Sequence, residues 1–185
     1  MWELNTPKPV KLICGILACD APALDAARLR LTEELGTPDL VSEVWPFDLT
    51  AYYQEQAGPD ILRQFIALAD LIDPGRLAGI KHLTNRLERE LAAELNRPWP
   101  RPVNFDPGLI EPSKLVLAST KNFAHRIYIG DQMFAEVTMT YVRGTWETFP
   151  FTFPDFKNGR YNPFLSRVRQ RLVSQLRGMN FDTTA

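Results

Sequence analysis

The sequence predicts an α+β fold, a ferredoxin-like β-α-β-β-α-β sandwich extended by a C-terminal β-hairpin and helix. Three observations predict it. Two amphipathic helix patterns alternate with apolar strand patterns in residues 1–106, a two-residue hairpin signal stands at Gly130-Asp131, and an amphipathic pattern closes the chain. We expect residues 1–185 to form a single domain, with 1–106 as the ferredoxin-like unit and 107–185 packed on it.

The first half shows clear helix starts and stops. Asp20 precedes Pro22 and predicts an N-cap, Gly36 ends that helical pattern, and Asp73-Pro74 opens a second helix. In the second helix one stripe recurs every three to four residues and contains Leu77, Ile80, Thr84, Leu87, Leu91 and Leu95. We expect Leu77, Ile80, Leu87 and Leu91 to be buried. The expected elements are strands over 8–17, 40–47, 61–71 and 103–106, a turn-rich segment over 48–60, and helices over 20–36 and 73–95.

The second half begins at Asp106-Pro107-Gly108, which predicts a turn. The apolar segment 114–119 fits either a strand or a helix. Strands are expected over 126–129 and 133–142. They are followed by a loop over 146–156 rich in aromatic residues and proline, and by a last helix capped by Asn162 with Pro163 in its first turn.

Several classes of protein are excluded or disfavoured by composition and motif. No apolar run approaches the roughly 18 residues of a membrane span, and the N-terminus lacks the pattern of a signal peptide, so we expect a cytoplasmic protein without a membrane partner. The net charge of -1 argues against a polybasic nucleic-acid tail. Neither a P-loop nor a dinucleotide-binding glycine motif is present, and the cofactor and oligomeric state stay open.

Polar side chains are concentrated between Asn104 and Lys157. The stretches Asn104–Gly108, Lys114–Lys121, His125–Gly130, Ala135–Thr138 and Phe151–Phe156 resemble those of a bacterial family, domain of unknown function 4416, over roughly residues 7–175. Tyr52-Tyr53, Lys81 and Asn85 look similar as well. The resemblance implies a bacterial cytoplasmic protein and supports a site in this region, but it implies no reaction.

Hairpin geometry predicts one specific pair. If Gly130 and Asp131 are the loop residues, Ile129 pairs with Gln132 and Ile127 with Phe134, which places His125 opposite Glu136 on one face of the ladder. A carboxylate beside an imidazole fixes its tautomer and favours its charged form, so this pair is the candidate acid–base pair. A purely structural cross-strand pair is the alternative.

The charged residues around this pair predict the ligand. Lys114, Lys121, Arg126 and Lys157 are expected to converge on a phosphate or carboxylate, although solvated surface lysines are an equal alternative. Magnesium on Asp106, Glu136 and Asp155 is the weaker reading, so no metal site is predicted. We expect a pocket over 104–157 for a small phosphorylated or carboxylated ligand, for example a nucleotide. Its ligand-binding residues are Asn104, Asp106, Lys114, Lys121, Arg126, Asp155 and Lys157.

A second hypothesis is a non-catalytic RNA-binding or protein-interaction module. It uses the aromatic loop 146–156 and the basic face of the last helix, where Arg167 and Arg171 are four residues apart. Bases stack on aromatic rings that are flanked by positive charge. More often, such rings pack a loop onto the core.

Overall fold

The computed structural model describes residue 4 and residues 6–50 and 53–181. Its strands are β1 (Val10–Ala18), β2 (Pro38–Val41), β3 (Trp45–Pro46), β4 (Leu62–Ile72), β5 (Val103–Ile110), β6 (Lys114–Ser119), β7 (Ile127–Gly130), β8 (Met133–Val142) and β9 (Thr145–Thr148). Its helices are α1 (Ala21–Leu35), α2 (Gln54–Ala57), α3 (Leu77–Leu95), α4 (Pro154–Lys157) and α5 (Asn162–Gly178). A 3-10 turn, η1 (Pro74–Arg76), precedes α3.

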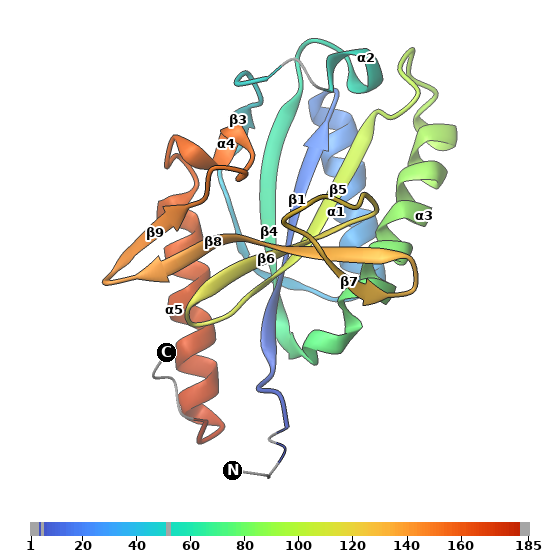
Figure 1. Ribbon diagram of the computed structural model, residues 1–185. Helices are drawn as coiled ribbons and strands as arrows, with labels where there is room; N and C mark the ends of the chain where they lie inside the picture. The colour runs from blue at the N-terminus through green and yellow to red at the C-terminus, as the bar shows by residue number, and fades with distance from the viewer. Residues whose placement is uncertain (1–3, 5, 51–52, 182–185) are drawn as a thin grey trace.

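The strands within this described part form one nine-stranded antiparallel sheet, which confirms the α+β class. The order is β2-β4-β1-β5-β6-β8-β7, with β3 paired to β4 and β9 paired to β8 (Figure 1). Strands β6 to β9 therefore extend the same sheet instead of forming a separate hairpin. The sheet is larger than the four-stranded one expected from the first half. No described helix has the length and apolar character needed to cross a membrane.

The central strand β1 is buried on both faces, which explains its nearly continuous apolar sequence. One set of alternating residues, including Leu12, Cys14 and Ile16, belongs to the core beneath α1 and α3. Ile13 points to the other face and shares a core with Val168 of α5 (Figure 1). The sheet thus separates two helical layers, with α1 and α3 on one face and α5 on the other.

The predicted helix signals of the first half are largely confirmed. The Asp20 carboxylate accepts a hydrogen bond from the backbone N–H of Ala23 at 2.8 Å, and Gly36 ends α1 with φ 103°. Asp73 accepts from Gly75 N–H, but it begins the turn η1 and α3 starts only at Leu77. The residues of the α3 stripe that we expect to be buried are buried, with Leu87 fully inaccessible.

The turn predicted at Asp106-Pro107-Gly108 is wrong, because β5 continues through it to Ile110. β6 pairs with β5 only from Gly108 onward, so one side of Pro107 has no strand neighbour, and a strand tolerates proline in that setting. Gly108 is required for a different reason. A Cβ atom there would overlap the carbonyl oxygen of Val116 and a methyl group of Leu117.

Four other expected boundaries are corrected. The strand expected over 40–47 is two short strands, β2 and β3, both paired to β4, and the turn-rich segment 48–60 contains α2. Segment 114–119, left open above, is strand β6. Trp146 lies in β9 with a buried indole, not in a loop. Asn162 is the first residue of α5, Tyr161 occupies the N-cap position, and no side chain caps this helix.

The hairpin between β7 and β8 is shifted by one residue from the predicted register. Ile127 pairs with Ala135, Tyr128 with Phe134 and Gly130 with Met133. The two loop residues are Asp131 and Gln132, with φ of 49° and 60°, because this tight turn takes positive φ at both central positions. Gly130 instead follows a bulge, and His125 precedes the strand in a turn.

Candidate functional site

A cavity of about 330 Å³ opens where the sheet bends between β5 and β6. Figure 1 shows β1, β4 and β5 running upright and β6 and β8 crossing in front of them. The floor and walls of the cavity come from β1, β4, β5, β6 and β8. The rim of the cavity comes from segment 119–126, from the Phe151–Phe156 segment and from Tyr53. The volume lies within the range of small-molecule sites.

The cavity exists because β6 separates from β5 beyond the Gly108–Leu117 pair, alongside the N-terminal part of β5. The pairing of these two strands covers only Gly108–Ile110, so residues Asn104–Asp106 of β5 have a strand neighbour on the β1 side alone. On the other side, the backbone N–H and carbonyl group of Phe105 form hydrogen bonds with side chains of α3. Glu88 accepts its N–H at 2.7 Å, and Lys81 Nζ donates to its carbonyl oxygen at 2.6 Å.

Arg101 completes this arrangement on the α3 side. Its guanidinium donates two hydrogen bonds to the second carboxylate oxygen of Glu88, at 2.9 and 2.6 Å. Both Lys81 and Glu88 are nearly inaccessible to solvent. Buried charges are tolerated when they are paired and hydrogen-bonded, and here they replace the missing strand partner.

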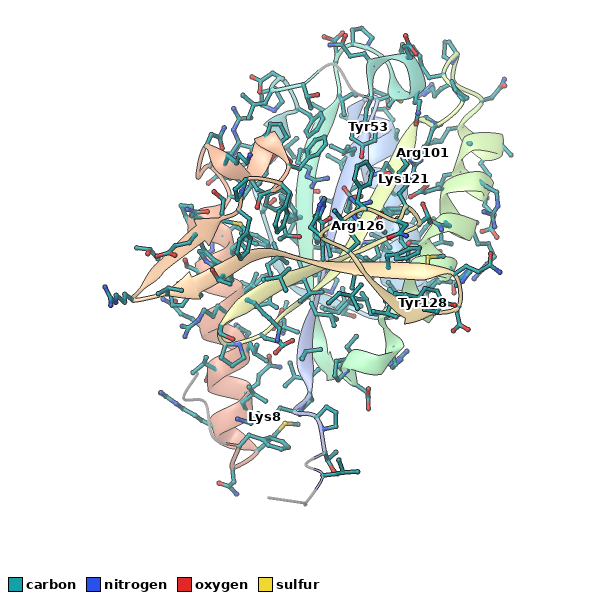
Figure 2. The ribbon with its side chains drawn as sticks, viewed as in Figure 1. Lys8, Tyr53, Arg101, Lys121, Arg126 and Tyr128 are labelled. Carbon is teal, nitrogen blue, oxygen red and sulfur yellow. The ribbon has the colours of Figure 1, made fainter. Side chains whose placement is uncertain are left out.

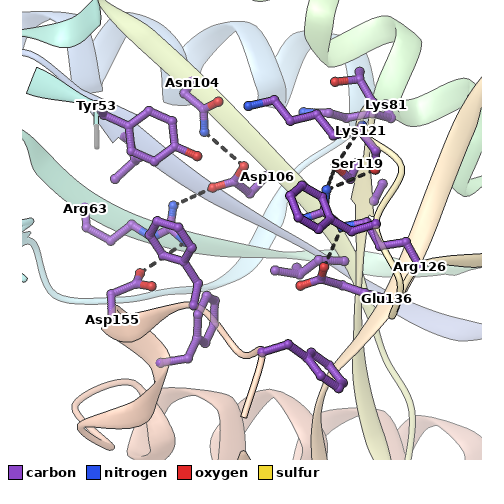
Figure 3. Close-up of a pocket in the computed structure, with 18 of the residues that line it drawn as sticks. Tyr53, Arg63, Lys81, Asn104, Asp106, Ser119, Lys121, Arg126, Glu136 and Asp155 are labelled. Carbon is purple, nitrogen blue, oxygen red and sulfur yellow. Dashed lines mark hydrogen bonds and ion pairs between the residues drawn. The ribbon is translucent and has the colours of Figure 1, made fainter. Parts of the chain in front are cut away.

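The floor is built around Arg63 of β4, whose side chain is 3% exposed. Its Nη1 contacts Asp106 Oδ2 at 2.7 Å, and its Nη2 lies 3.6 Å from Asp155 Oδ2. The guanidinium also stacks over Phe65, 4.6 Å from the ring centroid. Gly15 of β1 makes room for it, because a Cβ atom there would lie 3.1 Å from the guanidinium carbon. Figure 3 shows Arg63 between the two carboxylates.

The two carboxylates beside Arg63 have pKa values shifted in opposite directions. Burial opposes ionisation of Asp106, but Arg63 and Lys81 outweigh it and hold the pKa of Asp106 below its ordinary value. Burial raises the pKa of Asp155. The positive charge of Arg63 only partly offsets this rise, and the negative charge of Asp106 adds to it. The pair is therefore an ionised acceptor next to a carboxyl group that takes up a proton more readily.

A second cluster lies at the rim between segment 119–126 and β8. His125 Nε2 is 3.1 Å from Glu136 Oε2, and Arg126 Nε donates to the same oxygen at 2.7 Å. Arg126 Nη1 also donates to Ser119 Oγ and to the carbonyl oxygen of Lys121. The His125 ring stacks on Phe151, with centroids 4.3 Å apart. The predicted contact is thus present, although Arg126, not His125, continues the β7 register opposite Glu136.

Aromatic rings close the cavity at two places. Phe47, Tyr53 and Phe153 form one group, with Phe47 and Phe153 stacked at 6.4 Å. Phe123 and Phe151 form the other around His125. Flat walls of this kind favour a ligand with a planar or apolar part.

The cavity brings together most of the predicted site residues, which are Asn104, Asp106, Lys121, His125, Arg126, Glu136 and Asp155. Lys114 and Lys157 are the exceptions. Lys114 forms a surface ion pair with Glu111, and Lys157 donates to the carbonyl oxygen of Pro150. Neither lines the cavity, because β6 directs the ammonium group of Lys114, and α4 that of Lys157, to these other partners.

Sequence reasoning missed Arg63 and Arg101, which come from outside the 104–157 segment. The signal for Arg63 was an arginine inside an otherwise apolar strand pattern, since a buried charge there requires a partner. Arg101 carried no such signal in its proline-rich connector. Tyr53 and Lys81 line the cavity, Asn85 does not, and Tyr52 lies outside the described residues. Figure 2 shows Tyr53, Arg101, Lys121 and Arg126 gathered in the upper half of the molecule.

The donor set of this cavity does not assemble a metal site. In the described part of the chain, no group of three or more His, Cys, Asp or Glu side chains is placed to hold an ion. Asp106 and Glu136 are each engaged by an arginine.

Comparison with known proteins identifies the family. A family model described as "Domain of unknown function (DUF4416)" matches residues 8–172. The chain belongs to this family. The matched region contains all nine strands of the described sheet and all residues that line the cavity. No curated protein and no solved structure matches the chain.

Proposed function

We propose that the cavity binds a small phosphorylated or carboxylated molecule, with nucleotides among the candidates. The observation that carries this proposal is the charge of the lining. Among the described residues, five cationic side chains line the cavity, Arg63, Lys81, Arg101, Lys121 and Arg126, against the three carboxylates Asp106, Glu136 and Asp155. Glu88, behind the wall, pairs with Arg101 and Lys81, which leaves five cations against four carboxylates. A partly enclosed site with an excess of positive charge favours an anionic ligand.

His125 is the proposed acid–base residue, and Glu136 is the residue that orients it. Arg126 keeps the Glu136 carboxylate in place as an acceptor, so a neutral His125 that donates its Nε2–H to Glu136 has its lone pair on Nδ1. That nitrogen is then the one available to move a proton on a bound ligand. Stacking on Phe151 fixes the plane of the ring.

Other sequence predictions remain part of the proposal. The strand order β2-β4-β1-β5 with α1 and α3 on one face supports a ferredoxin-like unit within the larger sheet. Bacterial origin, a cytoplasmic location and a single domain are proposed from the sequence. The RNA-binding alternative is less favoured because Arg169 and Arg171 of α5 contact Pro112 and Asp39 of the same chain.

The test is a thermal-shift screen of phosphate esters, nucleotides and carboxylates at constant ionic strength, followed by calorimetric titration of each hit. A ligand at 100 times its Kd adds about 2.7 kcal/mol of stability. Lys121→Ala should weaken a hit about tenfold, whereas Lys114→Ala, a lysine outside the cavity, should leave its affinity unchanged. Equal losses in both variants would contradict the proposal. So would a screen without hits in which a single-stranded RNA binds.

A further inference from the structure

Asp106 is the carboxylate that the cavity leaves partly open. Its side chain is 24% exposed, whereas that of Asp155 is 2% exposed. Oδ2 accepts one hydrogen bond from Arg63, and Oδ1 accepts one from Asn104 at 3.0 Å. An ionised carboxylate has about four lone-pair positions, so about half of the acceptor capacity of Asp106 is still available toward the cavity.

The surroundings keep Asp106 an acceptor. Although burial opposes its ionisation, Arg63 and Lys81 hold its pKa below the ordinary value. A carboxylate of lowered pKa is a poor general base. Its role toward a ligand is therefore to accept a hydrogen bond, not to remove a proton.

One buried donor in the same place lacks a partner. Among the described residues, Arg63 Nε makes no hydrogen bond, whereas the neighbouring Asp155 is held by the 3.6 Å ion pair with Arg63 Nη2 and by Tyr161. The side chains of Arg63 and Asp155 line the cavity. Buried polar atoms without partners are rare, and at the base of a cavity they indicate a site that is completed by a bound group or by ordered water.

The charges around Asp106 restrict the group that it accepts from. Arg63 is in direct contact with it, Lys81 acts on it electrostatically, and Arg101 lines the same cavity. A cationic ammonium group would be repelled by these neighbours. A neutral donor, a hydroxyl or an N–H, avoids that repulsion.

The anionic end of the ligand belongs at the opposite side of the cavity. Arg126 lies there, and within the described residues its Nη2 makes no hydrogen bond while Nε and Nη1 do. Figure 3 shows the Lys121 side chain beside that of Lys81, between the two ends. Figure 3 shows the Asn104–Asp106–Arg63 group separate from the Arg126–Glu136 group. The Asp106 end therefore offers a partly open acceptor among cations, and the Arg126 end offers a cationic donor.

From this geometry we infer that the ligand carries a neutral hydrogen-bond donor bound by Asp106, in addition to an anionic group bound near Lys121 and Arg126. The inference rests on the proposed anion-binding function and narrows it. A methyl phosphate dianion or a simple carboxylate ion has no such donor. The chemical class is a hydroxyl-bearing or N–H-bearing phosphate ester or carboxylate.

Three probes separate these features in calorimetric titrations of the full chain, at constant ionic strength and with EDTA present. Methyl phosphate supplies the anion alone, ribose 5-phosphate adds hydroxyl groups, and 2′,3′-dideoxyuridine 5′-monophosphate adds a ring N–H without free hydroxyls. At least one of the last two should bind ten or more times more tightly than methyl phosphate. Asp106→Asn replaces one acceptor oxygen with a donor, so the ratio of this affinity to the methyl phosphate affinity, measured in the same variant, should fall at least threefold.

The outcomes distinguish the two claims. Equal affinity of the three probes for the wild-type chain overturns the donor inference and leaves the anion site intact. This comparison needs no variant, so it holds even if Asp106→Asn does not fold. An advantage that falls less than threefold in folded Asp106→Asn also overturns the inference. Binding by none of the probes overturns the anion site itself.

Discussion

Replacing Glu88 with alanine tests whether α3 side chains take the place of a strand partner along β5. Glu88 accepts the Phe105 N–H and two hydrogen bonds from Arg101. Its removal leaves a buried N–H without a partner and takes the counter-charge from Arg101. It also separates Lys81 from the carboxylate 4.0 Å away.

The expected decrease in the free energy of unfolding follows from these contacts. An unsatisfied buried backbone donor costs about 1–3 kcal/mol. Loss of the Arg101 contact adds less, because that side chain is 33% exposed and solvent screens it. Breaking a buried pair as a whole typically costs about 3–5 kcal/mol, and we expect Glu88→Ala to fall in that range. Glu88→Gln retains an acceptor for Phe105 and should cost about half as much.

Urea unfolding, monitored by tryptophan fluorescence and circular dichroism, measures the difference in stability between each variant and the wild type. Glu90→Ala is the matched control on the same helix, because Glu90 is 35% exposed and pairs with Arg30 and Arg86 at the surface. Its cost should be no more than about 1 kcal/mol. If Glu88→Ala were no more destabilising than Glu90→Ala, the claim that α3 side chains replace a strand partner along β5 would be refuted.

Three further predictions concern the helical core, the pH dependence of stability and the single domain. Leu87→Ala should cost about 2–5 kcal/mol because Leu87 is fully buried, whereas Leu29→Ala, at a residue 59% exposed, should be nearly neutral, and equal losses would show that the α3 stripe is not core. Because burial raises the pKa of Asp155 in the folded state, the wild type should lose stability as pH rises through that pKa. Asp155→Asn should therefore gain stability relative to the wild type from acidic to neutral pH, and a difference in stability that does not depend on pH would argue against the shift. The chain should unfold in one transition by both probes, and release of a stable tryptic fragment ending at Arg97 would contradict a single domain.

Much of the fold was readable from local patterns. The Asp20 cap, the Gly36 stop and the α3 stripe all depend on side chains within a few residues of each other, and the structure contains them. The β5 extension was not readable, because Pro107 and Gly108 have the composition of a turn. Only the approach of Val116 and Leu117 from β6 shows why a glycine is needed inside that strand.

The candidate site likewise contains one contact that the sequence predicted and one that it did not. His125 and Glu136 were paired from hairpin geometry, and the contact is present even though the turn is formed by Asp131 and Gln132 and the register is shifted. Their proximity survives because His125 reaches Glu136 from a turn. Arg63 was missed because its partners, Asp106 and Asp155, are more than forty residues away in the chain and meet it only across the folded sheet.

The most direct test of the central claim is a two-dimensional amide NMR titration of the chain with ribose 5-phosphate. The account predicts saturable shift changes at Asn104–Asp106 and at Ser119–Arg126, which lie at the two ends of the cavity, and unchanged resonances along the exposed face of α5. Shift changes confined to α5 and the exposed aromatic residues, or an absence of saturable changes at both cavity segments, would contradict it.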